Sequence, residues 1–180
     1  MDDLTIIKNM TRYMRDQVAA EYDPEFGKIG LPKPPADNKL DTGYVLVKPA
    51  VYDMWIPPKN HLEGYGYDMP CILVMSDGGS DRDGEASVRI RIAIGTYDPG
   101  LVTREGVVLS TKPNSRGYID LLNLLTKIRM KLSDRELTAG LFTVENGIEW
   151  GIYEEQHYPY WNAWLTCSCP IISMKNLPML

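Results

Sequence analysis

The sequence predicts an α+β fold: a mainly antiparallel mixed sheet with helices packed on one face. The first observation behind this prediction is a pair of amphipathic helical patterns, one at the start of the chain and one near residue 120. The second is a strict alternation between Val88 and Ile94, which is typical of a half-buried strand. The third is the pair Asn146-Gly147 between two apolar runs, the strongest short hairpin signal.

The chain is predicted to open with a helix over Asp3–Tyr22, capped by Asp2 or Asp3. Apolar residues recur there at three- and four-residue steps: Leu4, Ile7, Met10, Met14 and Val18.

A proline-rich segment follows the first helix. Eight of the 13 prolines fall between Pro24 and Pro70, which favours an extended arm with short strands at Tyr44–Lys48 and Ala50–Ile56. This arm either wraps on its own domain or reaches to a neighbour. We therefore divide the chain into a helix and arm over residues 1–69 and an α+β core over residues 70–180, within one structural domain overall.

The core is predicted to begin with a hairpin. Its first strand covers Cys71–Ser76, and turn-forming residues occupy Asp77–Gly84. In the second strand Val88, Ile90, Ile92 and Ile94 form the buried face, so Arg89 and Arg91 face water or a partner.

Residues 97–116 are predicted to form a polar loop, in which Val107, Val108 and Leu109 make an extra edge strand. Ser115 then caps a helix over Gly117–Leu132. The wide apolar stripe of this helix must pack on a sheet or on a neighbouring subunit: it holds Tyr118, Ile119, Leu121, Leu122, Leu124, Leu125, Ile128 and Leu132. Three strands complete the core, at Leu141–Val144, Ile148–Tyr153 and Trp161–Ile172.

Composition limits the function. With 19 basic and 24 acidic residues the net charge is −5, which argues against a dedicated nucleic-acid binder. We find no signal peptide and no segment that is long and apolar enough to span a membrane, so we expect a protein kept in the cytoplasm.

The chemistry-bearing residues give two competing interpretations. Cys167 and Cys169 share one face of a strand, where they either belong to the core or begin a zinc site with Cys71 and His157. We favour the core, because a structural zinc site usually shows two close ligand pairs. Gly64-Tyr65-Gly66 lacks the context of a nucleotide-binding loop, and His157 has no evident nucleophile. We expect no cofactor, no metal and no catalytic residue.

Charge is unevenly distributed along the chain. Residues 111–135 contain six cations and two anions, or +4, whereas residues 145–157 contain four glutamates and no cation, or −4. The two segments either neutralise each other within a monomer or meet head to tail in a closed ring. Their exposed members would include Lys127, Arg129, Glu154 and Glu155.

A series of short motifs over about residues 57–172 resembles the tail terminator, or tail completion, proteins of prophages and other long-tailed bacteriophages. The motifs are Pro57-Pro58-Lys59, Pro70–Val74, Ser87–Tyr97, Gly117–Leu124 with Ile128-Arg129, Glu149-Trp150, Glu154-Glu155-Gln156 and Tyr158-Pro159-Tyr160-Trp161. The sequence departs from the family pattern at Cys71, Met75, Cys167 and Cys169.

The resemblance implies a structural protein of the virion tail, assembled in the cytoplasm of the bacterial host, and no enzyme. Such proteins form a hexameric ring that caps the tail tube and meets the head connector, and DNA passes through transiently. Their fold is a mixed sheet flanked by helices.

The residues that we expect at contacts between proteins combine charge and aromatic surface. Tyr158, Tyr160 and Trp161 provide either exposed contact area or a corner of the core. The acidic turn near Asp81 is a candidate for subunit contact or for lining a DNA passage. The full set of expected interaction residues is Arg89, Arg91, Lys127, Arg129, Glu154, Glu155, Tyr158, Tyr160 and Trp161. The alternatives are a zinc- or thiol-dependent enzyme and a monomeric binding module.

Overall fold

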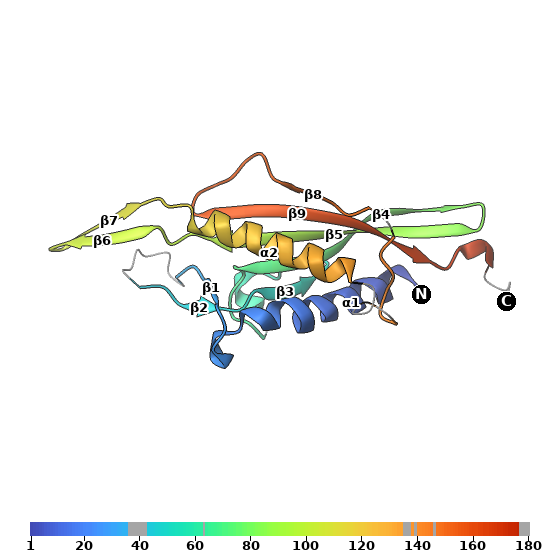
Figure 1. Cartoon of the computed structure of the whole chain (residues 1–180), viewed down its shortest axis with the longest axis horizontal. Coiled ribbons are helices and arrows are strands. Elements are labelled where there is room, and N and C mark those ends of the chain that lie inside the picture. The colour runs from blue at the N-terminus through green and yellow to red at the C-terminus, as the bar shows by residue number, and fades with distance from the viewer. Residues whose placement is uncertain (36–42, 63, 135–137, 139, 146, 177–180) are drawn as a thin grey trace.

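A five-stranded mixed sheet forms the centre of the molecule, and two helices cover one of its faces (Figure 1). The computed structural model describes residues 1–35, 43–62, 64–134, 138, 140–145 and 147–176. The strand order is β3-β4-β5-β9-β8, and only the β3–β4 pair is parallel. These strands cover Ala50–Asp53 (β3), Cys71–Arg82 (β4), Glu85–Tyr97 (β5), Glu149–Ile152 (β8) and Tyr160–Ile171 (β9). The predicted α+β class is confirmed.

The two faces of the sheet differ in what covers them. Apolar side chains of the three long strands point toward the helices. Ile72, Ile92 and Leu165 are among them and are fully buried. The predicted alternation of β5 is confirmed, because Val88, Ile90, Ile92 and Ile94 all lie in this core. The opposite face carries Cys71, Leu73 and Ala93 and has a smaller apolar cluster of its own.

The first helical segment has three geometries. It begins as the α-helix α1 (Asp3–Tyr13), continues as a π-helical turn over Met14–Val18, and ends as a 3₁₀ turn over Ala19–Tyr22. Asp2 caps α1, since its Oδ1 accepts a hydrogen bond from the backbone N–H of Thr5 at 2.7 Å. The predicted range and cap are therefore confirmed.

One member of the predicted stripe of α1 is wrong. Leu4 is exposed, whereas Ile6 is buried. At roughly 3.6 residues per turn, Leu4 lies about 120° around the helix from Met10, which is in the core, while Ile6 lies only about 40° from it. The helix packs against β3 and β4.

The proline-rich arm is wrapped on its own chain where the structure describes it. Its strands β1 (Leu31–Pro32) and β2 (Leu46–Val47) pair with each other, and β3 joins the central sheet beside β4. Two 3₁₀ turns complete the arm, at Pro24–Phe26 and Lys59–His61. Both predicted strands exist, but they are shorter than expected because prolines interrupt the segment.

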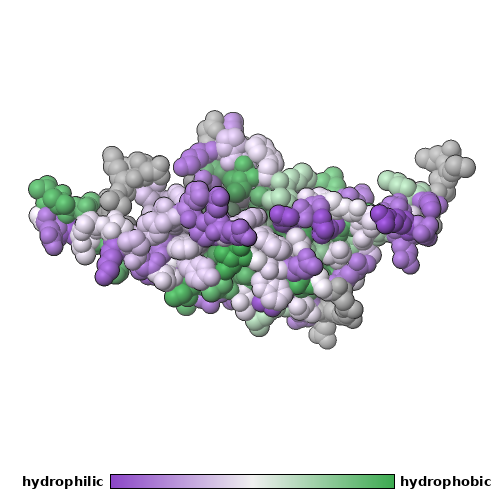
Figure 2. Space-filling view, turned by 90° about the horizontal axis from the view of Figure 1, so that it is seen from above, coloured by the Kyte–Doolittle hydropathy of each residue, from purple (hydrophilic) through white to green (hydrophobic). Residues whose placement is uncertain are grey.

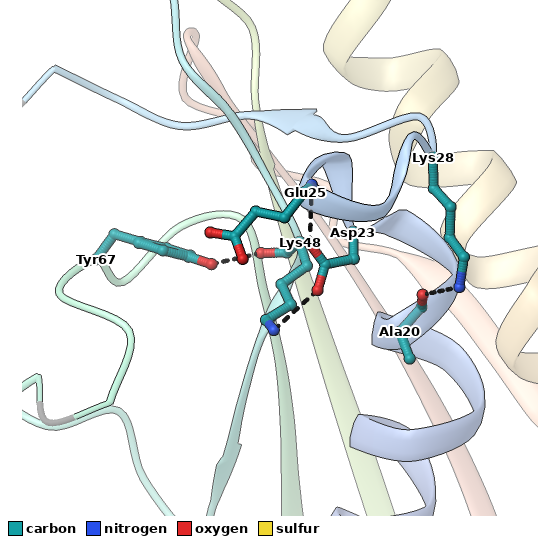
Figure 3. Close-up of polar contacts among 6 residues, drawn as sticks. All are labelled: Ala20, Asp23, Glu25, Lys28, Lys48 and Tyr67. Atoms are coloured by element: carbon teal, nitrogen blue, oxygen red, sulfur yellow. Dashed lines mark hydrogen bonds and ion pairs between the residues drawn. The ribbon is translucent and has the colours of Figure 1, made fainter.

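An ion pair joins the end of the first helical segment to this arm (Figure 3). The Lys48 ammonium lies 3.0 Å from Asp23 Oδ2, and the N–H of Glu25 donates to Asp23 Oδ1 at 3.2 Å. The hydroxyl of Tyr67 donates to the carbonyl oxygen of Lys48 at 2.7 Å. The hydrogen bond from Lys48 lowers the pKa of Asp23, and Asp23 in turn raises the pKa of Lys48.

The β4–β5 hairpin is longer than the sequence predicts. Strand β4 continues to Arg82, and the turn is only Asp83-Gly84, both with positive φ (55° and 88°), as a two-residue hairpin turn requires. The predicted turn over Asp77–Gly84 is therefore wrong. Strand β4 contains residues that favour turns, such as Asp77 and Gly78. It can do so because the pairing register with β5 shifts between Ser76 and Gly79, as at a β-bulge.

Residues 101–112 form a second hairpin where a polar loop with one edge strand was predicted; Val108 and Leu109 of that strand do lie in β7, whereas Val107 is in the turn. Within the described residues, strands β6 (Leu101–Glu105) and β7 (Val108–Lys112) pair only with each other, and they project beyond one end of the sheet (Figure 1). Gly106, with φ 63°, takes the first position of the turn, where glycine is preferred. Neither strand has a buried face, so the sequence of this segment lacks the alternation of apolar and polar residues that predicts a strand.

Helix α2 (Arg116–Ser133) packs on β5 and β9. Its buried residues are Gly117, Leu121, Leu124, Leu125, Ile128 and Leu132. The predicted stripe was too wide, because Ile119 and Leu122 are exposed on the outer face. Ser115 makes no side-chain cap; instead Asn114 Oδ1 accepts the N–H of Arg116 at 3.0 Å.

The last third of the chain departs from prediction at one strand. Residues Leu141–Val144 are not a strand: Phe142 is buried edge-on against Tyr13, with ring centroids 5.4 Å apart. Strands β8 and β9 confirm the other two predicted strands. Asn146 of the predicted turn lies outside the described residues. After β9 a 3₁₀ turn, Met174–Asn176, ends the described chain.

A buried carboxylate connects four elements at one end of the sheet. Asp98, which is fully buried, accepts hydrogen bonds from the N–H of Gly100 at 2.8 Å and of Gly117 at 3.2 Å. Its own N–H donates to the carbonyl oxygen of Pro159 at 2.7 Å. This junction therefore fixes the root of the β6–β7 hairpin, the start of α2 and the approach to β9 at the end of β5.

We expect Asp23→Asn to lower the free energy of unfolding, and the loss to depend on pH. The pKa of Asp23 is depressed in the folded state, so its contribution is present above the unfolded value near 3.8 and disappears as the pH falls through the lower folded value. Urea unfolding of the wild type and the variant at pH 7 and pH 3 measures this. The gap should be smaller at pH 3 than at pH 7, whereas Asp16→Asn, at an exposed aspartate, should give no such change. A gap independent of pH would contradict the role of the ion pair.

We expect Gly117→Ala to destabilise the protein, although alanine usually improves a helix by about 1 kcal/mol. A Cβ at this position would lie 2.7 Å from Asp98 Cβ and 2.8 Å from Trp161 Cδ1, so the junction would have to open. Thermal or urea unfolding measures the change. Asn123→Ala, at an exposed position of the same helix, is the control and should stabilise slightly. Equal gains from both substitutions would show that the junction is not tightly packed.

Candidate functional site

A groove on the helix-free face of the sheet brings together part of the predicted interaction segment. It has a volume of about 840 Å³. We call it the sheet groove; it is lined by Ile56, Met69, Cys71, Leu73, Ala93, Ile94, Gly95, Tyr153, Glu154, Glu155, His157, Tyr160 and Asn162.

The floor of the sheet groove is apolar. Cys71, Leu73 and Ala93 come from β4 and β5, and Met69 lies so close to Gly95 that a Cβ there would meet its Sδ at 2.5 Å. Burial raises the pKa of the Cys71 thiol to about 12, so it stays protonated near neutral pH and is no nucleophile. The floor therefore offers contact area rather than reactive groups.

Gln156 holds one wall of the groove. Its Nε2 donates to the carbonyl oxygens of Tyr153 at 2.6 Å and Asn162 at 2.9 Å, and its Oε1 accepts the N–H of Asn162 at 2.7 Å. These bonds close the loop between β8 and β9. The sequence points to Gln156 only as part of the motif Glu154-Glu155-Gln156, because a glutamine after two glutamates is typical of an exposed loop.

The rim of the groove is acidic. Glu154, Glu155 and His157 are exposed on the same loop. Within the described residues, neither glutamate forms an ion pair. An apolar floor beside an unpaired acidic rim suits an apolar partner segment that carries a cation.

The two predicted arginines lie on the same sheet face as the groove, and Arg91 lies beside Tyr153, which lines the groove. Arg89 Nε and Arg91 Nη2 both contact Asp77 Oδ2, at 3.2 and 3.1 Å. Arg91 also lies over the ring of Trp164, at 5.9 Å from its centroid. Arg89 remains the more exposed of the pair, and Asp77 compensates part of their charge.

The basic residues of α2 contact their own chain. The ammonium groups of Lys127 and Lys131 both bind the carboxylate of Glu21, with Lys131 at 2.8 Å. Arg129 stacks on Trp150 with its guanidinium carbon 3.3 Å from the ring centroid. Within the described residues no ion pair links residues 111–134 to residues 145–157; two cations of the basic segment, Lys127 and Lys131, pair with the first helical segment instead. Arg135 lies outside the described residues.

The three predicted aromatic residues have different environments. Tyr158 is partly exposed, and its hydroxyl lies where a side chain at Gly100 would be, at the root of the β6–β7 hairpin. Tyr160 lies in the groove and packs on Tyr97 at 5.7 Å. Trp161 packs edge-on against Tyr118 at 5.3 Å beside the main core, which matches the core-corner alternative.

The candidate zinc ligands lie on opposite faces of the sheet. Cys167 and Cys169 are buried toward the helices, whereas Cys71 and His157 line the sheet groove. The four side chains cannot form one tetrahedral site, and the described residues contain no cluster with metal-ligating composition. The core interpretation of Cys167 and Cys169 is confirmed.

Asp81 also has a partner in its own chain. Its carboxylate accepts hydrogen bonds from Ser173 Oγ at 2.7 Å and from the N–H of Met174 at 2.9 Å. It therefore fixes the segment after β9 against the β4–β5 hairpin.

Comparison with known protein families and with curated proteins gives no match. The resemblance to tail terminators therefore stays a prediction. Among the helices of the described chain, none is long and apolar enough to cross a membrane.

We expect Gln156→Glu to open the wall of the sheet groove. The substitution removes two donated hydrogen bonds and places a carboxylate against the carbonyl oxygens of Tyr153 and Asn162. Hydrogen exchange of residues 153–162 should accelerate by about tenfold or more, which corresponds to roughly 1.4 kcal/mol of local stability. Glu155→Gln, the inverse change at an exposed neighbour, should leave exchange unchanged. Similar exchange in both variants would mean that Gln156 does not hold the loop.

Proposed function

We propose that the protein is a structural subunit of a phage or prophage tail, which assembles into a ring that caps the tail tube and meets the head connector. One observation carries the proposal: the β6–β7 hairpin projects from the body with apolar side chains that nothing in the described chain covers. Val107 is 100% exposed, Val108 65% and Leu101 57%. Figure 2 shows hydrophobic surface at the end of the molecule where Figure 1 places this hairpin.

An isolated two-stranded hairpin is at best marginally stable in water. Here the hairpin pairs with no other strand among the described residues, and its two-residue turn exposes valine instead of a polar residue. A partner that covers these side chains would gain their burial and order the strands. The elongated outline in Figure 1, with a hairpin at each end, gives a subunit two distant contact regions, as a ring needs.

The charge of the protein supports passage of DNA better than retention of DNA. The net charge is −5, and several of the cations that the sequence singled out are paired within the chain: Arg91, Lys127 and Lys131 contact Asp77 or Glu21. A surface whose net charge is negative repels phosphate or leaves it free to move. This agrees with a ring through which DNA passes during packaging or ejection.

We expect the purified protein to form annular particles at high concentration. Six chains of 20.4 kDa would give a mass of about 122 kDa by light scattering, and dilution should return the monomer. Electron microscopy of the same sample shows whether the particles are closed rings. A monomer at every concentration, by scattering and by microscopy, would contradict the proposal and favour a monomeric binding module.

A further inference from the structure

We propose that the β6–β7 hairpin of one copy occupies the sheet groove of the next copy. The inference rests on the proposed function, since it requires that copies of the chain assemble. It goes further in naming both halves of the contact between them.

The hairpin has one fully exposed face with mixed chemistry. Directly paired residues share a face, so Leu101 lies beside Lys112 and Val108 beside Glu105 on the same side. All four are exposed. Val107 extends this surface at the tip, and Arg104 adds a cation on the other face. The hairpin thus presents one apolar face that carries Lys112 and Glu105, and Arg104 on the opposite face gives the hairpin as a whole an excess of one positive charge.

The sheet groove has the complementary chemistry. Its floor of Leu73, Ala93 and Met69 can receive aliphatic side chains, and its rim carries Glu154 and Glu155. In the part of the chain that the structure describes, Arg104 and Lys112 form no ion pair, and neither do the two glutamates. Opposite unpaired charges on the hairpin and on the rim favour the pairing of these two surfaces and fix its orientation.

The hairpin cannot fill the groove of its own chain. The groove lies over Ala93 and Gly95, before the end of β5, whereas the hairpin starts after β5 and continues away from the sheet (Figure 1). Its five-residue strands carry the tip about 17 Å outward, at roughly 3.4 Å per residue. Asp98 and Gly100 hold the root in this direction. A hairpin that occupies the groove must therefore belong to another copy.

Such a contact joins two different surfaces. Each copy offers one hairpin and one groove, so the contact is heterologous and repeats from copy to copy until the ring closes. A tail tube protein could occupy the groove only with an apolar, basic segment of its own. This chain already carries such a segment in its β6–β7 hairpin, which favours a second copy as the occupant.

Two complementary variants test the inference. Val107→Asp/Val108→Asp removes the apolar tip; aspartate is well tolerated in a turn, where Val107 lies, and Val108 is an exposed first residue of β7. Glu154→Lys/Glu155→Lys reverses the rim without touching the floor. Each variant alone should raise the concentration for half-assembly by about tenfold or more. An equimolar mixture should form dimers of one copy of each and stop there, because only one intact hairpin and one intact groove remain for each pair.

A charge swap and a matched substitution complete the design. Adding Arg104→Glu/Lys112→Glu to the Glu154→Lys/Glu155→Lys chain should restore assembly, because the pairing is re-created with reversed signs. Ile29→Asp replaces another β-branched residue that is 80% exposed, far from both surfaces in sequence, and should leave assembly unchanged. Circular dichroism confirms that all variants fold.

The possible failures are distinguishable. If the wild type forms rings and the tip variant forms them equally well, the inference is wrong and the proposed function stands. If the tip variant still forms rings but these rings no longer bind tail tubes, the inference is also wrong, because the hairpin then contacts the tube rather than the next copy. The proposed function stands in that case too. If the wild type itself never assembles, the proposed function fails, and the contact between copies fails with it.

Discussion

The hydrogen bonds of one buried carboxylate, Asp98, determine how the outer parts of the molecule are placed on the sheet. Asp98 directly follows β5, and its side chain accepts hydrogen bonds from the backbone N–H groups of Gly100 and Gly117. A buried carboxylate without donors would be costly, so these two segments are held where they can supply them. The hairpin root and the start of α2 are consequently fixed to the same point. Gly117 permits this approach because it has no Cβ between Asp98 and Trp161.

The unequal covering of the two sheet faces gives the molecule its candidate contact surface. Helices α1 and α2 close one face with a continuous core. The other face is covered in part by the arm, with the rings of Tyr52, Tyr65 and Tyr67 packed edge to face, and in part by the loop between β8 and β9 that Gln156 holds. Between these two coverings the apolar floor stays open as the sheet groove. A groove of this kind forms where the covering segments end, and the strand pattern contains no sign of it.

The charged residues show how sequence and structure differ in what they predict. The segments of opposite charge were evident from composition, but the partner of Lys127 and Lys131 is Glu21, more than a hundred residues earlier. Arg129 binds an aromatic face rather than an acid. The net charge of a segment indicates where contacts between charged residues can form. Which residues pair is decided by the packing of the first helical segment and of β8 beside α2. Glu154 and Glu155 keep their exposed charge because their loop extends beyond that packing.

The sequence alone determined the elements whose side chains alternate against a core: the first helix and its cap, α2, β5 and β9. In these elements burial imposes a period that can be read locally. Tertiary structure decided the rest. The β6–β7 hairpin has no buried face and therefore no period, and the turn of β4–β5 moved to Asp83-Gly84 because pairing with β5 outweighed the turn propensity of the preceding residues. The sheet groove depends on the packing of Met69 against Gly95, which are 26 residues apart in the sequence and meet only when the sheet has formed, and on the hydrogen bonds of Gln156 that hold the loop beside them.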